Sequence, residues 1–120
     1  MIGDHRSFRR AVISGGTFDR AVLTFSDFQQ ARIAGISAVD ADFSGSNFRA
    51  VKMQRIDLSN STLAGADLTR TNLDNAILTG ADFAKADLYG AEMVGADLTG
   101  ANFSHSRLLT ANLRDAVIIG

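Results

Sequence analysis

A large apolar residue recurs at every fifth position of this chain, from Phe8 to Ile118. Of the 23 positions in this register, which we call the centre position, 22 hold Phe, Leu, Ile or Met, and Ala38 is the exception. A small residue usually lies two positions before the centre, and Asp or Asn lies between the two in eleven repeats. Nine of the eleven glycines lie two positions after a centre.

A period of five excludes the regular elements. On an α-helix, five residues advance about 500°, so successive centres would lie about 140° apart and spread around the helix. On a straight strand, an odd period would send alternate centres to opposite faces. Only a chain that turns a corner every five residues keeps all centres inside, with Gly or Asn suited to a turn position of positive φ. Four such sides close a coil of about 20 residues, and between five and six stacked coils make a rod about 27 Å long.

Several repeats match the pattern A(D/N)LXX closely. They read ADLTR at 66–70, ADFAK at 81–85 and ADLTG at 96–100. The sequence resembles the pentapeptide-repeat family over essentially its whole length. This resemblance implies an all-β, right-handed quadrilateral parallel β-helix. We expect a single domain over 1–120, with repeats from about residue 6 to 120.

Ala38 is the one small centre, and it would leave a hole in a close-packed core if its surroundings did not adjust. Its partner two positions earlier is Ile36, which reverses the usual order of small and large residues. Phe18 lies one coil above. We therefore expect Ile36 and Phe18 to fill the space.

The side chains available for chemistry do not form a catalytic pattern. The chain has no Cys, which excludes a disulfide, a thiol nucleophile and a Cys-ligated metal. Carboxylates spaced by five, such as Asp82 and Asp87, would lie on adjacent sides and diverge around a corner, where they can accept backbone N–H groups. His5 and His105 are solitary. We therefore expect no enzyme activity, no cofactor and no metal site.

The chain gives no sign of a membrane segment. No apolar run approaches the roughly 20 residues that span a bilayer, and the first residues lack the apolar stretch of a signal peptide. We expect a cytoplasmic protein. The net charge of −1 gives no general reason to bind nucleic acid.

Surface charge is uneven in the first three coils. Leaving aside the Asp/Asn positions of the first side, two adjacent sides carry six cations and no acid, namely Arg9, Arg10, Arg32, Arg49, Lys52 and Arg55. We interpret this surface as a docking face for an unidentified acidic protein partner. The alternative is a solvated face on which long side chains cover the backbone. No aromatic residue interleaves with these cations, so direct nucleic-acid binding is not expected.

The last coil combines core residues with apolar residues at positions that are usually polar, and a terminal coil leaves its edge unpaired. Its candidate contact residues are Phe103, Leu108, Leu113, Val117, Ile118 and Ile119. The pattern predicts a homodimer that forms through this coil. The alternative is an exposed end that is simply tolerated.

The functional prediction is a scaffold or interaction module that presents flat faces of a rigid rod to a protein partner. The resemblance also implies an alternative, because some pentapeptide-repeat proteins imitate DNA and modulate DNA gyrase, which links the family to quinolone resistance. That mechanism suits a strongly acidic rod, often with projecting loops and a C-terminal dimerisation helix. The net charge of −1 and the cationic surface depart from it. A third reading is a spacer domain of a larger protein.

Overall fold

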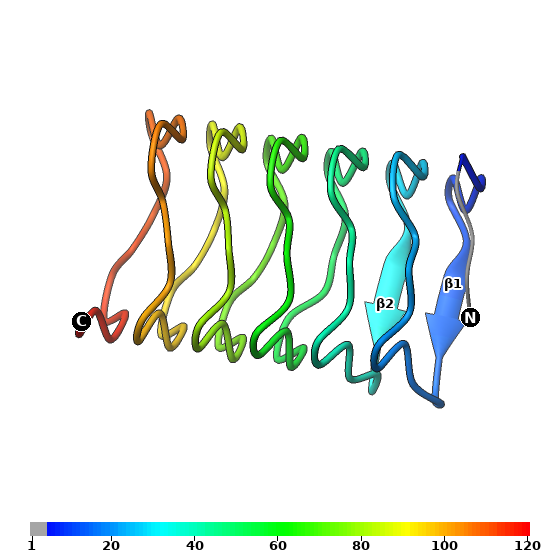
Figure 1. Ribbon diagram of the computed structural model, residues 1–120, viewed down its shortest axis with the longest axis horizontal. Coiled ribbons are helices and arrows are strands. Elements are labelled where there is room, and N and C mark those ends of the chain that lie inside the picture. Colours follow the sequence, from blue (N-terminus) through cyan, green and yellow to red (C-terminus); the bar gives the residue numbers. More distant parts are fainter. Residues whose placement is uncertain (1–4) are drawn as a thin grey trace.

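The computed structural model describes residues 5–120 (Figure 1). The chain winds into a four-sided parallel β-helix whose coils lie side by side along its longest axis, with extents of 31 × 23 × 20 Å. Bridges between neighbouring coils join residues 20 apart, from Ser7 with Asp27 to Asp97 with Val117. The coil of 20 residues predicted from the period is therefore confirmed.

We number the four sides in chain order by their inward-pointing centres, and corner 1 is the pair of residues that follows each centre of side 1, and so on. The centres are Phe8, Phe28, Phe48, Leu68, Leu88 and Leu108 on side 1; Ile13, Ile33, Met53, Leu73, Met93 and Leu113 on side 2; Phe18, Ala38, Leu58, Leu78, Leu98 and Ile118 on side 3; and Leu23, Phe43, Leu63, Phe83 and Phe103 on side 4.

Regular strands are few although the fold is all-β. Strand β1 (Val12–Ser14) pairs in parallel with β2 (Arg32–Ala34), and both lie on side 2 of the first two coils. Elsewhere each side contributes one bridging residue per coil. A corner follows before a second pair can form, so the ladder runs along the rod rather than along the chain.

The corners are tight turns with a left-handed residue. The residue two after each centre has positive φ, whether it is Gly65 at 67° or Arg70 at 57°. At corner 4, Ala66 N–H donates to the Leu63 carbonyl at 3.0 Å. Together these features match the type II pattern expected from the sequence. The Asp/Asn position secures the turn, as when the Asp67 carboxylate accepts the N–H of Thr69 at 3.0 Å.

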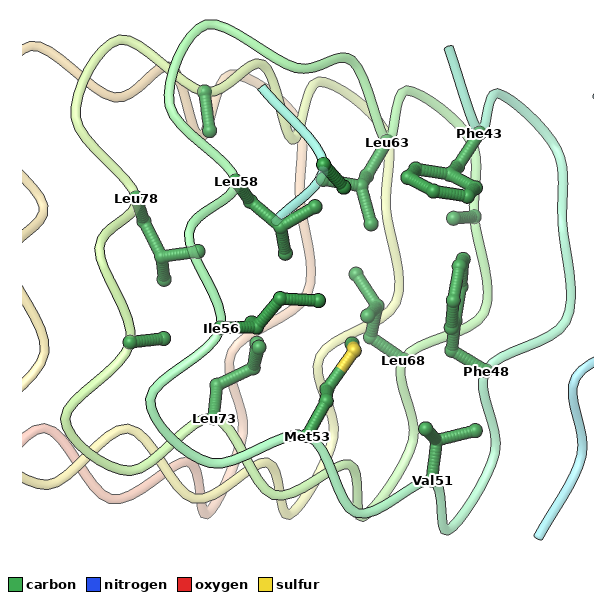
Figure 2. Close-up of a cluster of buried hydrophobic side chains, with 14 of the residues drawn as sticks. Phe43, Phe48, Val51, Met53, Ile56, Leu58, Leu63, Leu68, Leu73 and Leu78 are labelled. Atoms are coloured by element: carbon green, nitrogen blue, oxygen red, sulfur yellow. The ribbon is translucent and has the colours of Figure 1, made fainter. Parts of the chain in front are cut away.

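The centres and small residues fill the inside of the coil (Figure 2). The rings of Phe8, Phe28 and Phe48 stack one above another, with centroids 4.7 and 4.9 Å apart. Phe43 meets Phe48 edge-on from the neighbouring side at 5.3 Å. Successive coils thus pack a continuous aromatic and aliphatic core.

The space at Ala38 is filled as expected. Ala38 is fully buried, and Ile36 takes the larger volume two positions earlier, where it is also buried. The Phe18 ring is buried as well and packs edge-on against Phe28 and Phe43 at 6.5 and 6.4 Å. No pocket opens there or elsewhere within residues 5–120.

Candidate interaction surface

The aspartates of the sides act as parts of the corners. Asp82 accepts the N–H of Ala84 at 2.9 Å, and Asp87 accepts that of Tyr89 at 3.0 Å. They therefore serve the local backbone on adjacent sides, as the sequence analysis predicted. Over the described part of the chain, no three His, Asp or Glu side chains gather as a metal site.

Two carboxylates have a lowered pKa because they accept several hydrogen bonds. The hydroxyl of Ser37 and then the N–H of Val39, both one coil on, donate to Asp19 at 2.7 and 2.8 Å and lower its pKa. The hydroxyl and N–H of Thr99 lower the pKa of Asp97 in the same way. Hydrogen bonding to the charged form favours that form.

Side 1 and corner 1 hold three of the six predicted cations, and all three have a partner. Arg9 forms an ion pair with Asp27 at 3.4 Å, and Arg49 forms one with Asp67 at 3.5 Å. The Arg10 guanidinium donates to the Gln30 amide oxygen at 3.0 Å. The Asp positions of side 1, left aside in the sequence analysis, thus reduce the charge that this part of the surface presents.

The other three predicted cations are exposed and close together. Arg32 and Lys52 are paired along side 2 by a bridge between successive coils. Arg55 lies at corner 2, three residues after Lys52. Within residues 5–120 none of the three has an ion-pair partner. This group is the part of the predicted face whose positive charge is free for an outside partner.

Charge divides the rod lengthwise. The described residues of sides 1 and 2 with their corners carry ten cations and six anions, whereas those of sides 3 and 4 carry two cations and six anions. The cations of the second half are Arg20 and Lys85, and its anions are Asp19, Asp40, Asp42, Asp57, Asp82 and Asp97. One half therefore has a net charge of +4 and the other of −4.

The sequence analysis missed a cluster at corner 1 in the later coils. Arg70 and Arg107 both lie over the ring of Tyr89, and Arg107 also pairs with Asp87 at 3.2 Å. In contrast to the first three coils, an aromatic ring here lies among arginines. The spacings of 19 and 18 residues between Tyr89 and the two arginines, one coil to either side, are the sequence signal that could have revealed the cluster.

The coil of residues 101–120 exposes apolar surface as expected. Phe103, Leu108 and Leu113 are only partly buried, whereas Ile118 and Ile119 are 65% and 64% exposed. Val117 is also exposed. One coil earlier, the Phe83 N–H donates to Asn102 O of this coil, but the described residues offer no such acceptor to Phe103.

None of the described residues belongs to a helix that is long and apolar enough to cross a membrane.

Comparisons with known proteins agree with this geometry. A family model described as pentapeptide repeats, in eight copies, matches residues 26–65, 41–80, 66–104 and 76–115. A search of curated protein sequences returned no significant match.

Three solved structures share the fold at low sequence identity. HetL, a pentapeptide repeat protein involved in heterocyst differentiation regulation from Nostoc sp. strain PCC 7120, is similar with a TM-score of 0.77 and 20% identity, over 95% of this chain and 63% of HetL. This chain thus spans less than two thirds of HetL. The pentapeptide repeat protein Rfr23 from Cyanothece 51142 has a TM-score of 0.68 and 19% identity, over 97% and 90% of the two chains.

The third is QnrB1, a plasmid-mediated fluoroquinolone resistance protein, in a trypsin-treated variant. It has a TM-score of 0.52 and 19% identity, over 92% of this chain and 68% of QnrB1. Such proteins form right-handed quadrilateral β-helices, and the fold class expected from the sequence is thereby confirmed.

Proposed function

Because the chain belongs to the pentapeptide-repeat family, we propose that it is a non-enzymatic interaction module that docks an acidic protein partner on its cationic half. Arg32, Lys52 and Arg55 carry this proposal. They are exposed and close together, and their charges are not compensated by any described residue. The backbone beneath them is fixed by the ladder between coils, so a partner meets a surface that is already organised.

Charge complementarity of this kind acts on encounter rate and on the choice of partner. The ion pairs on side 1 are half-exposed and contribute little to folding stability. The cations can therefore be changed without loss of the fold.

Two matched double variants test the proposal. The side 2 variant combines Arg32→Glu with Lys52→Glu. The control variant combines Arg20→Glu with Lys85→Glu on the acidic half, so both replace one Arg and one Lys and change the net charge equally. Lysate of the source organism is passed over immobilised wild type and both variants. We expect a protein that wild type and control retain and the side 2 variant loses. Equal recovery on all three, or recovery of nothing, would refute the proposal.

We further propose that the coil of residues 101–120 pairs two copies of the chain. The exposure of Ile118 and Ile119 supports it, because an apolar patch beside an unpaired edge is a ready contact surface. Light scattering should give twice the chain mass, and Ile119→Asp should restore the mass of one chain. Ile77→Asp, which changes an exposed Ile of side 3 in the middle of the rod, should not. A wild type of single-chain mass at high concentration contradicts the pairing.

The acidic half favours a second candidate, modulation of DNA gyrase or another type II topoisomerase by imitation of DNA, as in quinolone resistance. Asp57 and Asp97 lie two coils apart on side 3, and no described cation pairs with them. A gyrase supercoiling assay tests this candidate. Inhibition that is lost in Asp57→Asn with Asp97→Asn would support it, and no effect at micromolar protein would exclude it.

A further inference from the structure

The cluster at corner 1 combines charge, an aromatic ring and an apolar side chain on the outside of the rod. The guanidinium carbons of Arg70 and Arg107 lie 5.9 and 5.2 Å from the centroid of the Tyr89 ring. Leu109 occupies the position of Tyr89 in the next coil and is 62% exposed. We call these four residues the corner 1 cluster.

Neighbouring residues hold the cluster in place. Asp87 pairs with Arg107 at 3.2 Å, which keeps that guanidinium beside the ring. A Cβ on Gly90 would lie 3.3 Å from Arg70 Cγ, so the glycine leaves room for the Arg70 side chain to lie along the corner. A guanidinium stacked on an aromatic face keeps its N–H groups, which lie in its own plane, available for a bidentate acceptor.

The arrangement favours a carboxylate over a nucleobase. Arg70 has no ion-pair partner within residues 5–120, so one positive charge is left over after Asp87 and Arg107 pair. Because both arginines already lie over the Tyr89 ring, its faces are occupied and a base has no free face on which to stack. The ring edge and Leu109 stay accessible for an apolar side chain.

Resting on the docking function proposed above, we propose that the corner 1 cluster is the anchor point for the acidic partner. The anchored segment carries a carboxylate next to an apolar side chain. Arg70 binds the carboxylate through two N–H groups, and the apolar side chain packs on Leu109 and the edge of Tyr89. Tyr and Arg are enriched among the few residues that dominate binding energy at protein interfaces.

The chain supplies its own probe, because Tyr89 is its single Tyr and it has no Trp. The ligand is a short synthetic peptide of alternating Glu and Leu with one Trp at its end. Energy transfer from Tyr89 to this Trp reports binding at the cluster, and the Trp emission of the peptide gives the affinity for variants without the tyrosine. We expect saturable transfer with this peptide and none with a peptide in which Gln replaces Glu.

Variants then separate the parts of the cluster. Tyr89→Ala and Arg70→Ala should each weaken binding about tenfold. Tyr89→Phe should bind as the wild type does, because the aromatic ring is kept. Phe25→Ala, which removes an exposed aromatic ring at corner 4, is the matched control and should have no effect.

The anchor is refuted if the Gln peptide binds equally well, if a single-stranded DNA oligonucleotide binds more tightly, or if Tyr89→Ala binds like Phe25→Ala. The lysate capture described above separates this failure from failure of the docking function. If the side 2 variant loses the partner but Tyr89→Ala retains it, docking stands and the anchor is wrong. If only Tyr89→Ala loses the partner, the anchor stands and the assignment of side 2 is wrong.

Discussion

Gly45 and Gly65 occupy corner 4 in successive coils with the same φ of 67°, but their surroundings differ. A Cβ on Gly45 would overlap the ring of Phe25, which lies across it from the preceding coil, whereas a Cβ on Gly65 would meet nothing within 4 Å. The five-residue pattern marks both glycines as turn residues. It does not distinguish them, because the difference depends on a side chain 20 residues earlier.

We predict that Gly65→Ala lowers the free energy of unfolding by about 1 kcal/mol, the cost of a left-handed backbone for a residue with a Cβ. Gly45→Ala should cost more, because the ring of Phe25 must also move. Urea unfolding of the two variants measures the difference. Equal losses would show that Phe25 does not rest on Gly45.

A pH effect also belongs to single residues. The pKa values of Asp19 and Asp97 are lowered in the fold from the ordinary value of 3.8. A lowered carboxyl pKa stabilises the fold above the unfolded value, and this contribution is lost as pH falls through the folded value. Thermal unfolding temperature should therefore drop below about pH 4.

The double variant Asp19→Asn with Asp97→Asn should lose less on acidification than the wild type does. Asp40→Asn, which removes one exposed corner carboxylate, should follow the wild-type curve. Identical pH profiles for all three proteins would contradict this account.

At the scale of the element, the corner is the unit, and the period predicts its position and its left-handed residue throughout. The sequence does not show how each corner closes. At corner 4 of the first coil, the Ser46 hydroxyl accepts the N–H of Ser26 at 3.0 Å and donates to the Leu23 carbonyl at 2.8 Å. Ser61 sits in the same small-residue register, but its own N–H closes the turn onto Leu58 at 3.1 Å. Both residues read as small, and only the coordinates separate a bridging hydroxyl from a dispensable one.

We predict that Ser46→Ala lowers the free energy of unfolding by about 1–3 kcal/mol, because it leaves a buried N–H and a buried carbonyl without partners. Ser61→Ala should cost less, because the backbone bond of its corner remains. Chemical denaturation measures both. A Ser61→Ala loss as large as that of Ser46→Ala would refute the bridging role.

At the scale of the whole molecule, the repeat predicts the coil, the core and the two faces of each side. It predicts the cationic surface less completely, because ion pairs such as Arg9 with Asp27 depend on how far a side chain reaches into the next coil. The same limit hid the contact of Arg70 with Tyr89. Charges counted by side reveal the division of the rod, whereas the partner of each charge requires the structure.

The central claim is that the cationic half of a rigid rod docks an acidic protein. It is tested most directly by the dissociation constant of a purified captured partner, measured by titration calorimetry against three proteins. We predict that the side 2 variant binds at least about tenfold more weakly than the wild type, whereas the control variant stays within about twofold. Equal affinities of the two double variants would contradict the claim.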